Sequence, residues 1–258
     1  MTFNFSVPSI THCLLIETTQ GLVLVDTGLG LGDYEKPSTR MRAFLAFNRV
    51  PRDADETALR QVANLGYSPS DVKQIVLTHL HLDHSGGLPD FPWAEVHILA
   101  SEHQAVLHPK GAKAWISYDA SHWAHGPRWV MHEPVADTWF GLPSSPVLGD
   151  AGRRILLIPL IGHSPGHCGV AIETAAGWLL HCGDAYVRDV QIDPERPRSP
   201  FPKWAAAIDR TLFPQEAITC LRMLVRDHGS QVKPFSSHDP ITFAELRGEL
   251  HSPQGVGQ

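Results

Sequence analysis

Three imidazoles and one carboxylate fall within six residues of one another near position 80. They are His79, His81, Asp83 and His84, and they lie in residues 78–87, THLHLDHSGG. Imidazole and carboxylate groups are the side chains that bind zinc, iron or manganese. Without a metal, such a cluster would lose hydration and its members would repel one another when protonated. An exposed polar loop is the alternative, and the density of ligands favours a metal site.

The residues around this stretch predict how the ligands are positioned. Residues 74–77, QIVL, form a short apolar run rich in β-branched side chains, which predicts a buried strand. Gly86 and Gly87 then give the backbone the freedom to turn. His79 and His81 are two residues apart, so extended backbone projects both to the same side. The two ligands that follow can turn toward a second point in space.

The spacing His-X-His-X-Asp-His resembles the signature of the metallo-β-lactamase fold superfamily of metallohydrolases. The resemblance implies an α/β fold, a four-layer αββα sandwich, with a two-metal site at one edge. The sequence shows no internal repeat and no linker, so residues 1–258 are expected to form a single domain.

Further pieces of the family pattern follow in order along the chain. Residues 162–167, GHSPGH, resemble the third metal motif, whose first histidine is the ligand, here His163; the proline that usually precedes this motif is Ile161. Asp184 follows an apolar strand pattern and resembles the bridging aspartate. His238 ends another such pattern and resembles the last ligand. His167 is expected to support the site without binding metal.

By this resemblance the protein binds two divalent metal ions, most simply zinc, with iron or manganese as alternatives. The ligands of one ion are His79, His81 and His163, those of the other are Asp83, His84 and His238, and Asp184 bridges the two. Two such ions would share a bridging hydroxide that attacks an electrophilic carbonyl or phosphoryl centre. Asp83 would act as a catalytic residue by passing a proton from the nucleophile to the leaving group.

Among the branches of the family, the resemblance is greatest to acyl-homoserine-lactone lactonases. The expected substrate is therefore a small molecule with a lactone or activated ester carbonyl. Other ester, amide or phosphotriester hydrolases remain alternatives, as do a β-lactamase and a non-enzymatic metal-binding sensor or scaffold. Those lactonases place a tyrosine three residues after the bridging aspartate. Here Tyr186 lies two residues after it, and it is expected to be a second catalytic residue, while Cys182 is assigned to packing.

Composition excludes several classes of protein. The net charge of −6 argues against a nucleic-acid partner, and no 18-residue apolar run predicts a membrane span. The first residues, MTFNF, lack the basic start and apolar core of a signal peptide. Four scattered cysteines fit reduced thiols. A cytoplasmic location is expected.

The remaining patterns predict ordinary elements of an α/β domain. Strands are expected at 13–18, 22–25, 95–99, 154–159, 168–173, 178–181 and 232–235, helices at 53–65, 215–228 and 242–250, and an extended connector at 194–202. Asp26, in the triplet Asp26-Thr27-Gly28, is either a supporting residue of the site or only part of a turn. His97, His103 and His108 are interpreted as structural or surface residues.

Two stretches rich in apolar and aromatic residues have no ligand role. Residues 29–52 contain a short helix pattern that includes Phe44 and Phe47, and residues 115–140 form a long insertion without clear periodicity that includes Trp123. Core packing is one interpretation of both stretches. The alternatives are that they border an apolar substrate pocket, and that 29–52 forms a lid or a homodimer contact.

Overall fold

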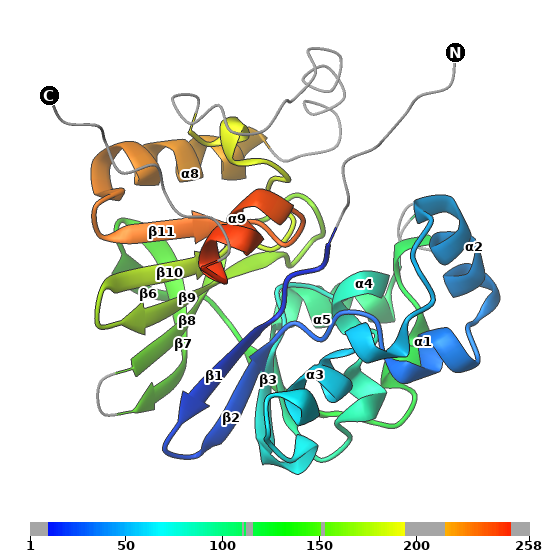
Figure 1. Cartoon of the computed structure of the whole chain (residues 1–258). Helices are drawn as coiled ribbons and strands as arrows, with labels where there is room; N and C mark the ends of the chain where they lie inside the picture. The colour runs from blue at the N-terminus through cyan, green and yellow to red at the C-terminus, as the bar shows by residue number, and fades with distance from the viewer. Residues whose placement is uncertain (1–9, 110, 112–115, 151–152, 194–214, 249–258) are drawn as a thin grey trace, which may run out of the picture.

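Two β-sheets lie face to face, with helices on the outer side of each (Figure 1). The computed structural model describes residues 10–109, 111, 116–150, 153–193 and 215–248. The predicted four-layer αββα sandwich is thereby confirmed. Among the described residues, no helix combines the length and the apolar character needed to cross a lipid bilayer.

The first sheet has five strands and is mainly parallel. Its order is β1 (Leu14–Thr18), β2 (Gly21–Val25), β3 (Val72–Val76), β4 (Glu95–Leu99) and β5 (Arg128–His132). β1 and β2 form the predicted antiparallel hairpin, and β2 through β5 are parallel neighbours. Parallel strands direct their carboxyl ends to one edge of the sheet, and the loops after β2 and β3 therefore emerge close together.

The second sheet has six strands and is mainly antiparallel. Its order is β11 (Val232–Phe235), β10 (Gly177–His181), β9 (Cys168–Thr174), β8 (Arg153–Pro159), β7 (Leu142–Asp150) and β6 (Val135–Trp139). β10 and β11 are parallel to each other, and β8 runs in the same direction because it and β10 both pair antiparallel with β9. The segments that follow β8, β10 and β11 therefore leave the sheet at the same edge.

The apolar core lies between the sheets and under the helices. In β2, Val23 and Val25 face the other sheet, whereas Leu22 and Leu24 belong to the cluster under the helices of the first half. This alternation is the period of two expected of a strand covered on both faces.

The helices close the two outer faces. The first sheet is covered by elements that include α3 (Ala58–Asn64) and η4 (Ala120–Trp123), and α1 (Leu31–Glu35), α2 (Thr39–Asn48), α4 (Leu82–Ser85) and α5 (Ala100–Leu107) belong to the same half. The second sheet is covered by α8 (Gln215–His228), and α9 (Pro240–Leu246) follows β11. α8 begins and ends where the sequence predicts, and it buries Ala217, Ile218, Leu221 and Leu224 on one face.

The segment 115–140 is not the irregular insertion that the sequence suggests. It contains β5 and β6, the edge strands of the two sheets, so it is the place where the chain crosses from the first sheet to the second. β7 was also not predicted, because Pro143 and Pro146 interrupt its pattern. Its pairing with β8 has an irregularity between Pro146 and Leu148, which is where a strand tolerates proline.

Two predicted helices have different bounds in the structure. The helix expected at 53–65 is divided into a 3₁₀ turn, Ala54–Glu56, and α3, because Thr57 between them has extended backbone. The closing helix is α9 and begins two residues earlier than expected. The connector at 194–202 lies outside the described residues.

His97 has a structural position between the sheets, as predicted. Its Nδ1 lies 2.9 Å from Nε2 of His132, and its Nε2 contacts the amide oxygen of Gln74. A neutral ring satisfies this arrangement if Nε2–H donates to Gln74 and Nδ1 accepts from His132. Burial, and then the neighbouring His132, lower the pKa of His97 to about 4.

The ionisation of His97 should make the stability of the protein depend on pH. Between pH 6.5 and pH 4 the unfolded chain binds a proton at His97 that the folded chain does not, so the free energy of unfolding falls as pH is lowered through this range. His97→Gln should remove about 1–2 kcal/mol of the loss that occurs between pH 7 and pH 5. Urea unfolding at both pH values measures the difference.

The matched control is His108→Gln, because His108 is exposed. The control should keep the pH dependence of the parent protein. Equal losses of stability in the parent and in His97→Gln would contradict the prediction.

Candidate metal centre

The seven predicted ligands converge from five segments at one edge of the sandwich. Two follow β3, two lie on α4, and the others follow β8, β10 and β11; in this order they are His79, His81, Asp83, His84, His163, Asp184 and His238. α4 has a single turn and begins after His81, so it carries the second pair of ligands back toward the first pair.

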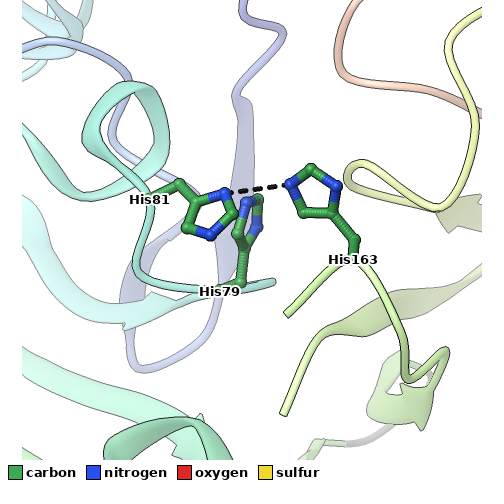
Figure 2. Close-up of side chains that lie close together, drawn as sticks. All are labelled: His79, His81 and His163. Carbon is green, nitrogen blue, oxygen red and sulfur yellow. Dashed lines mark hydrogen bonds between the residues drawn. The ribbon is translucent and has the colours of Figure 1, made fainter. Parts of the chain in front are cut away.

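His79, His81 and His163 form the first group. Their ring centroids are 4.5 to 4.9 Å apart, and Nε2 of His163 lies 2.9 Å from Nδ1 of His81 (Figure 2). Two nitrogens bound tetrahedrally to one zinc ion at ~2.1 Å would be ~3.4 Å apart. The three side chains therefore lie close to the arrangement of a three-histidine metal site.

Asp83, His84 and His238 form a second group. Oδ2 of Asp83 lies 3.8 Å from Nε2 of His84 and 3.6 Å from Nε2 of His238. Their potential ligand atoms all lie within 4.8 Å of one another. A carboxylate and two imidazoles from α4 and from the loop after β11 are thus gathered at a second point.

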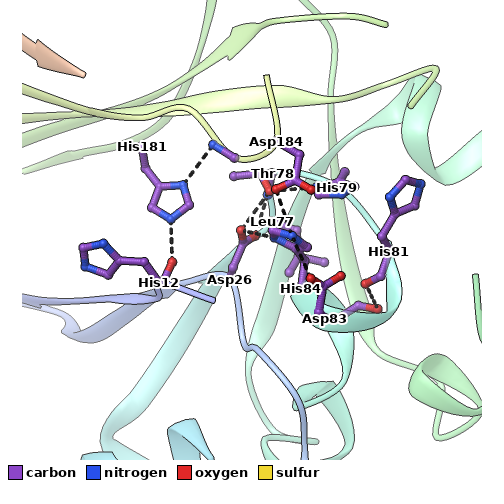
Figure 3. Close-up of polar contacts among 12 residues, drawn as sticks. His12, Asp26, Leu77, Thr78, His79, His81, Asp83, His84, His181 and Asp184 are labelled. Atoms are coloured by element: carbon purple, nitrogen blue, oxygen red, sulfur yellow. Dashed lines mark hydrogen bonds and ion pairs between the residues drawn. The ribbon is translucent and has the colours of Figure 1, made fainter. Parts of the chain in front are cut away.

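Asp184 lies between the two groups. Oδ1 is 3.1 Å from Nε2 of His84 and 3.1 Å from Nε2 of His238, while Oδ2 is 3.3 Å from Nε2 of His163 (Figure 3 shows Asp184 beside His79 and His84). One carboxylate therefore faces a histidine of the first group and two histidines of the second. This is the position expected of a bridging ligand.

Charges are strongly coupled in this cluster. Burial would lower the pKa of His84 and of His238, but the surrounding carboxylates, Asp184 first, raise the pKa of His84 well above its usual value and that of His238 to about 9. Burial would raise the pKa of Asp184, but His238, His84 and His163 hold it well below the usual range. Burial itself lowers the pKa of His79. The carboxylate of Asp184 is therefore held in its ionised form by the imidazoles around it.

The residues fit divalent metal ions. Nε2 of His79 is buried and has no hydrogen-bond partner among the described residues, and Nε2 of His84 and Oδ1 of Asp184 lie 3.1 Å apart without the geometry of a hydrogen bond. Buried polar atoms without a partner are costly, and a bound cation would satisfy all three. Three imidazoles at one point, and two imidazoles with carboxylates at the other, are donor sets suited to zinc or to iron and manganese.

Asp26 orients the two innermost histidines. Its carboxylate accepts from Nδ1–H of His84 at 2.8 Å and from the main-chain N–H and the hydroxyl of Thr78, both at 2.8 Å (Figure 3). Because the Thr78 hydroxyl donates to Asp26, it accepts from Nδ1–H of His79 at 3.0 Å. Both rings therefore present Nε2 to the cluster. Asp26 is therefore a supporting residue of the site and not only part of a turn.

Glu102 is a supporting residue that the sequence did not reveal. Its carboxylate has no exposed surface and accepts four hydrogen bonds, from Leu80 N at 3.1 Å, Tyr118 Oη at 3.1 Å, Ser164 Oγ at 2.6 Å and Gly166 N at 2.9 Å. It therefore joins the loop of His79 and His81 to the loop of His163. The only signal was a glutamate in the first turn of a helix, which is usually an exposed capping residue.

Gly166 shows how closely the two loops approach. A Cβ at this position would lie 2.0 Å from the main-chain nitrogen of Glu102, so no other residue fits without moving the backbone. His167 follows and supports the loop of Asp184, because its Nε2 accepts from the main-chain N–H of Asp184 at 2.9 Å. Its Nδ1–H donates to Leu160 O at 2.9 Å.

The two apolar stretches contact each other and support α4. His122, from the second stretch, contacts Asp33, from the first, at 3.0 Å, and its Nδ1 lies 3.0 Å from Oγ of Ser85 on α4. Trp123 packs against the apolar cluster of the first sheet, so core packing is the interpretation that holds for it. Phe47 is 88% exposed.

Tyr186 requires a correction. Its side chain has no exposed surface and belongs to the apolar cluster under α8, and its hydroxyl donates to Asp189 at 3.4 Å. β10 ends at His181, and the loop that contains Asp184 directs the side chain of Tyr186 into the core. A substrate cannot reach it in this structure. Cys182 is also fully buried in this cluster, in agreement with a packing role.

Comparison with known proteins identifies the family of this chain. The chain matches the metallo-beta-lactamase superfamily over residues 7–231. A probable metallo-hydrolase of Mycobacterium tuberculosis is 42% identical over 197 residues, which are 76% of this chain and 63% of that protein. This chain therefore matches less than two thirds of the length of that relative. An N-acyl homoserine lactonase of Bacillus thuringiensis is 28% identical over 195 residues, which are 73% of this chain and 69% of that protein.

A solved structure shares the fold. It is an N-acyl homoserine lactone hydrolase with the product N-hexanoyl-L-homoserine bound at its catalytic metal centre; the TM-score is 0.62 at 22% identity, over 95% of this chain and 86% of that one. The sequence match covers most of the chain, and the fold of the solved structure agrees with it. This protein belongs to the metallo-β-lactamase superfamily.

Proposed function

We propose that this protein is a dinuclear metal-dependent hydrolase of a lactone or similarly activated ester carbonyl. The observation that supports it best is the position of Asp184, whose two carboxylate oxygens face histidines of both ligand groups. The substrate is a small molecule met in the cytoplasm. Zinc is the expected metal, with iron or manganese as alternatives.

Two observations favour a lactone over a β-lactam. One relative is an N-acyl homoserine lactonase, and the shared part of the chain includes most of the fold. The residue between the two ligand groups is Asp184, whereas Cys182 is buried in the apolar cluster beside it. A bridging carboxylate puts more negative charge on the metal pair than a neutral ligand would, which favours a strong nucleophile attacking an ester-like carbonyl.

When bound, the two ions would supply a bridging hydroxide as nucleophile and would polarise the substrate carbonyl. The protein determines from which side the substrate enters. The side chains of His84 and Asp26 have no exposed surface, whereas those of Asp83, His163, Asp184 and His238 are 11 to 17% exposed. Asp83, the most exposed of these ligands, is therefore placed on the open side, where it can transfer a proton to the leaving alkoxide.

The substrate class is tested with a panel. Lactones, thioesters, nitrocefin and a phosphotriester are assayed on zinc-loaded and manganese-loaded protein, and kcat/KM is compared. We expect a lactone to give the highest value. A higher kcat/KM for nitrocefin than for every lactone would contradict the lactonase proposal. A higher value for a phosphotriester or a simple ester would assign the site to that class instead.

A two-metal site would be visible in the metal content of the protein. The protein should bind about two ions per chain, and Asp184→Ala should lose the bridge and nearly all turnover while it remains folded. Elemental analysis after metal loading and gel filtration measures the ion content, and circular dichroism measures the fold. Asp227→Asn, an exposed carboxylate paired with Arg226, is the control and should bind two ions. One ion or fewer in the parent protein would contradict the dinuclear site.

Glu102→Gln should weaken the first metal position. Four donors surround this carboxylate, and an amide would direct its own NH₂ group at some of them, so the loops of His81 and His163 should shift. Loss of such an outer partner typically weakens metal affinity about 10–100-fold. Glu173→Gln, which removes an exposed pair with Arg154, is the matched control.

Competition with a chelator measures the affinity for zinc of the parent protein, of Glu102→Gln and of the Glu173→Gln control. An unchanged affinity for the first ion in Glu102→Gln, in a folded protein, would show that the buried carboxylate has no part in positioning the ligands.

A further inference from the structure

We propose that residues 10–12, here named the N-terminal strap, are the positioning element of the second metal position. In this proposal the main chain of the strap fixes the orientation and the tautomer of His238. The inference rests on the two-metal site proposed above. It concerns a part of the chain that precedes the first strand and lies far in sequence from the ligand that it contacts.

The contact between the strap and His238 is direct. Nδ1 of His238 lies 2.6 Å from the main-chain oxygen of Ile10, and a carbonyl oxygen only accepts. Nδ1 therefore carries the proton and Nε2 is left to bind metal. Nε2 is the atom that faces the cluster, 3.1 Å from Oδ1 of Asp184 and 3.6 Å from Oδ2 of Asp83.

The strap is itself attached to two of the three ligand loops of the second sheet, those after β10 and β11. The main-chain N–H of His12 donates to Ser237 O at 2.9 Å, in the residue before His238. Nε2–H of the buried His181 donates to His12 O at 2.7 Å, and its Nδ1 accepts from Gly183 N at 3.3 Å, in the residue before Asp184 (Figure 3). The strap therefore connects the segment after β10 to the segment after β11.

Ring packing holds the strap in place. The His12 ring lies 5.0 Å from the ring of Phe235 on β11 and 4.7 Å, edge to face, from the ring of Phe243 on α9. Only 6% of His12 is exposed. The chain then continues into β1, so the strap joins the first sheet to the ligand loops of the second (Figure 1).

The two fully buried histidines of the cluster are oriented differently. Nδ1 of His84 contacts the side chain of Asp26, and Nδ1 of His79 contacts the hydroxyl of Thr78. Both partners lie on or next to strands of the first sheet. His238 depends on a main-chain oxygen of the strap, so the strap and the second ion should be thermodynamically linked, each favouring the other.

Hydrogen exchange in the intact protein tests this linkage. Zinc ions are added in one and then two equivalents, and exchange of the His12 N–H, which donates to Ser237, is followed by NMR. We expect the second equivalent to slow this exchange at least about fivefold and the first to change it little. An exchange rate of the His12 N–H that does not change on addition of the second equivalent of zinc would overturn the proposal.

A second test changes the acceptor on Ile10 in the full-length chain. A synthetic peptide of residues 1–12, with an ester in place of the amide between residues 10 and 11, can be ligated at Cys13 to the remainder. An ester carbonyl is a weaker acceptor, so the affinity for the second zinc ion should fall about tenfold while that for the first stays within twofold. The all-amide chain made by the same ligation is the control.

His12→Ala provides a variant that needs no ligation. It removes the ring contacts with Phe235 and Phe243 but leaves the main chain unchanged. It should therefore also lower the affinity for the second zinc ion and leave the affinity for the first unchanged. His108→Ala, at an exposed site, is its control. Two ions bound with parental affinities in both the ester chain and His12→Ala would overturn this inference alone. A single ion in the intact chain would overturn the two-metal site and the strap together.

Discussion

The arrangement of the site depends on the hydrogen bonds around the carboxylate of Asp26. Asp26 is fully buried, and its backbone adopts a left-handed conformation. Its carboxylate accepts hydrogen bonds from Thr78 and His84. It therefore ties the end of β2 to the loop after β3. Burial of this charge would be very costly without those donors. Because they are present, one acidic residue determines which nitrogen His84 presents and, through the Thr78 hydroxyl, which nitrogen His79 presents.

The parts of the fold with strong periodic signals were predictable. The β1–β2 hairpin, β3 and α8 follow from alternation or helical spacing, and the order of the ligand motifs places His79 through His238 at strand ends. β5, β6 and β7 were not predictable in the same way. They lie at or near sheet edges, where one face is half exposed, and Pro143 and Pro146 obscure β7.

Supporting residues of the site were harder to infer than its ligands. Glu102 sits at the start of a helix, where a glutamate is ordinarily a solvent-exposed cap, and only the tertiary approach of Ser164 and Gly166 gives it another role. The predicted position of Tyr186 in the active site was wrong for a related reason. Sequence distance from Asp184 does not reveal to which side a turn directs a side chain, and here the turn directs it into the core under α8.

The crossover between β5 and β6 has a consequence for folding. It divides the chain into a first half that builds one sheet and a second half that builds the other. Both ligand groups draw residues from both halves: His163 and His238 come from the second half, as does Asp184 between the groups, and the other ligands come from the first. Neither half can assemble a group alone. A bound cation would therefore link the two halves of the chain, and its site would be complete only after these distant segments had docked.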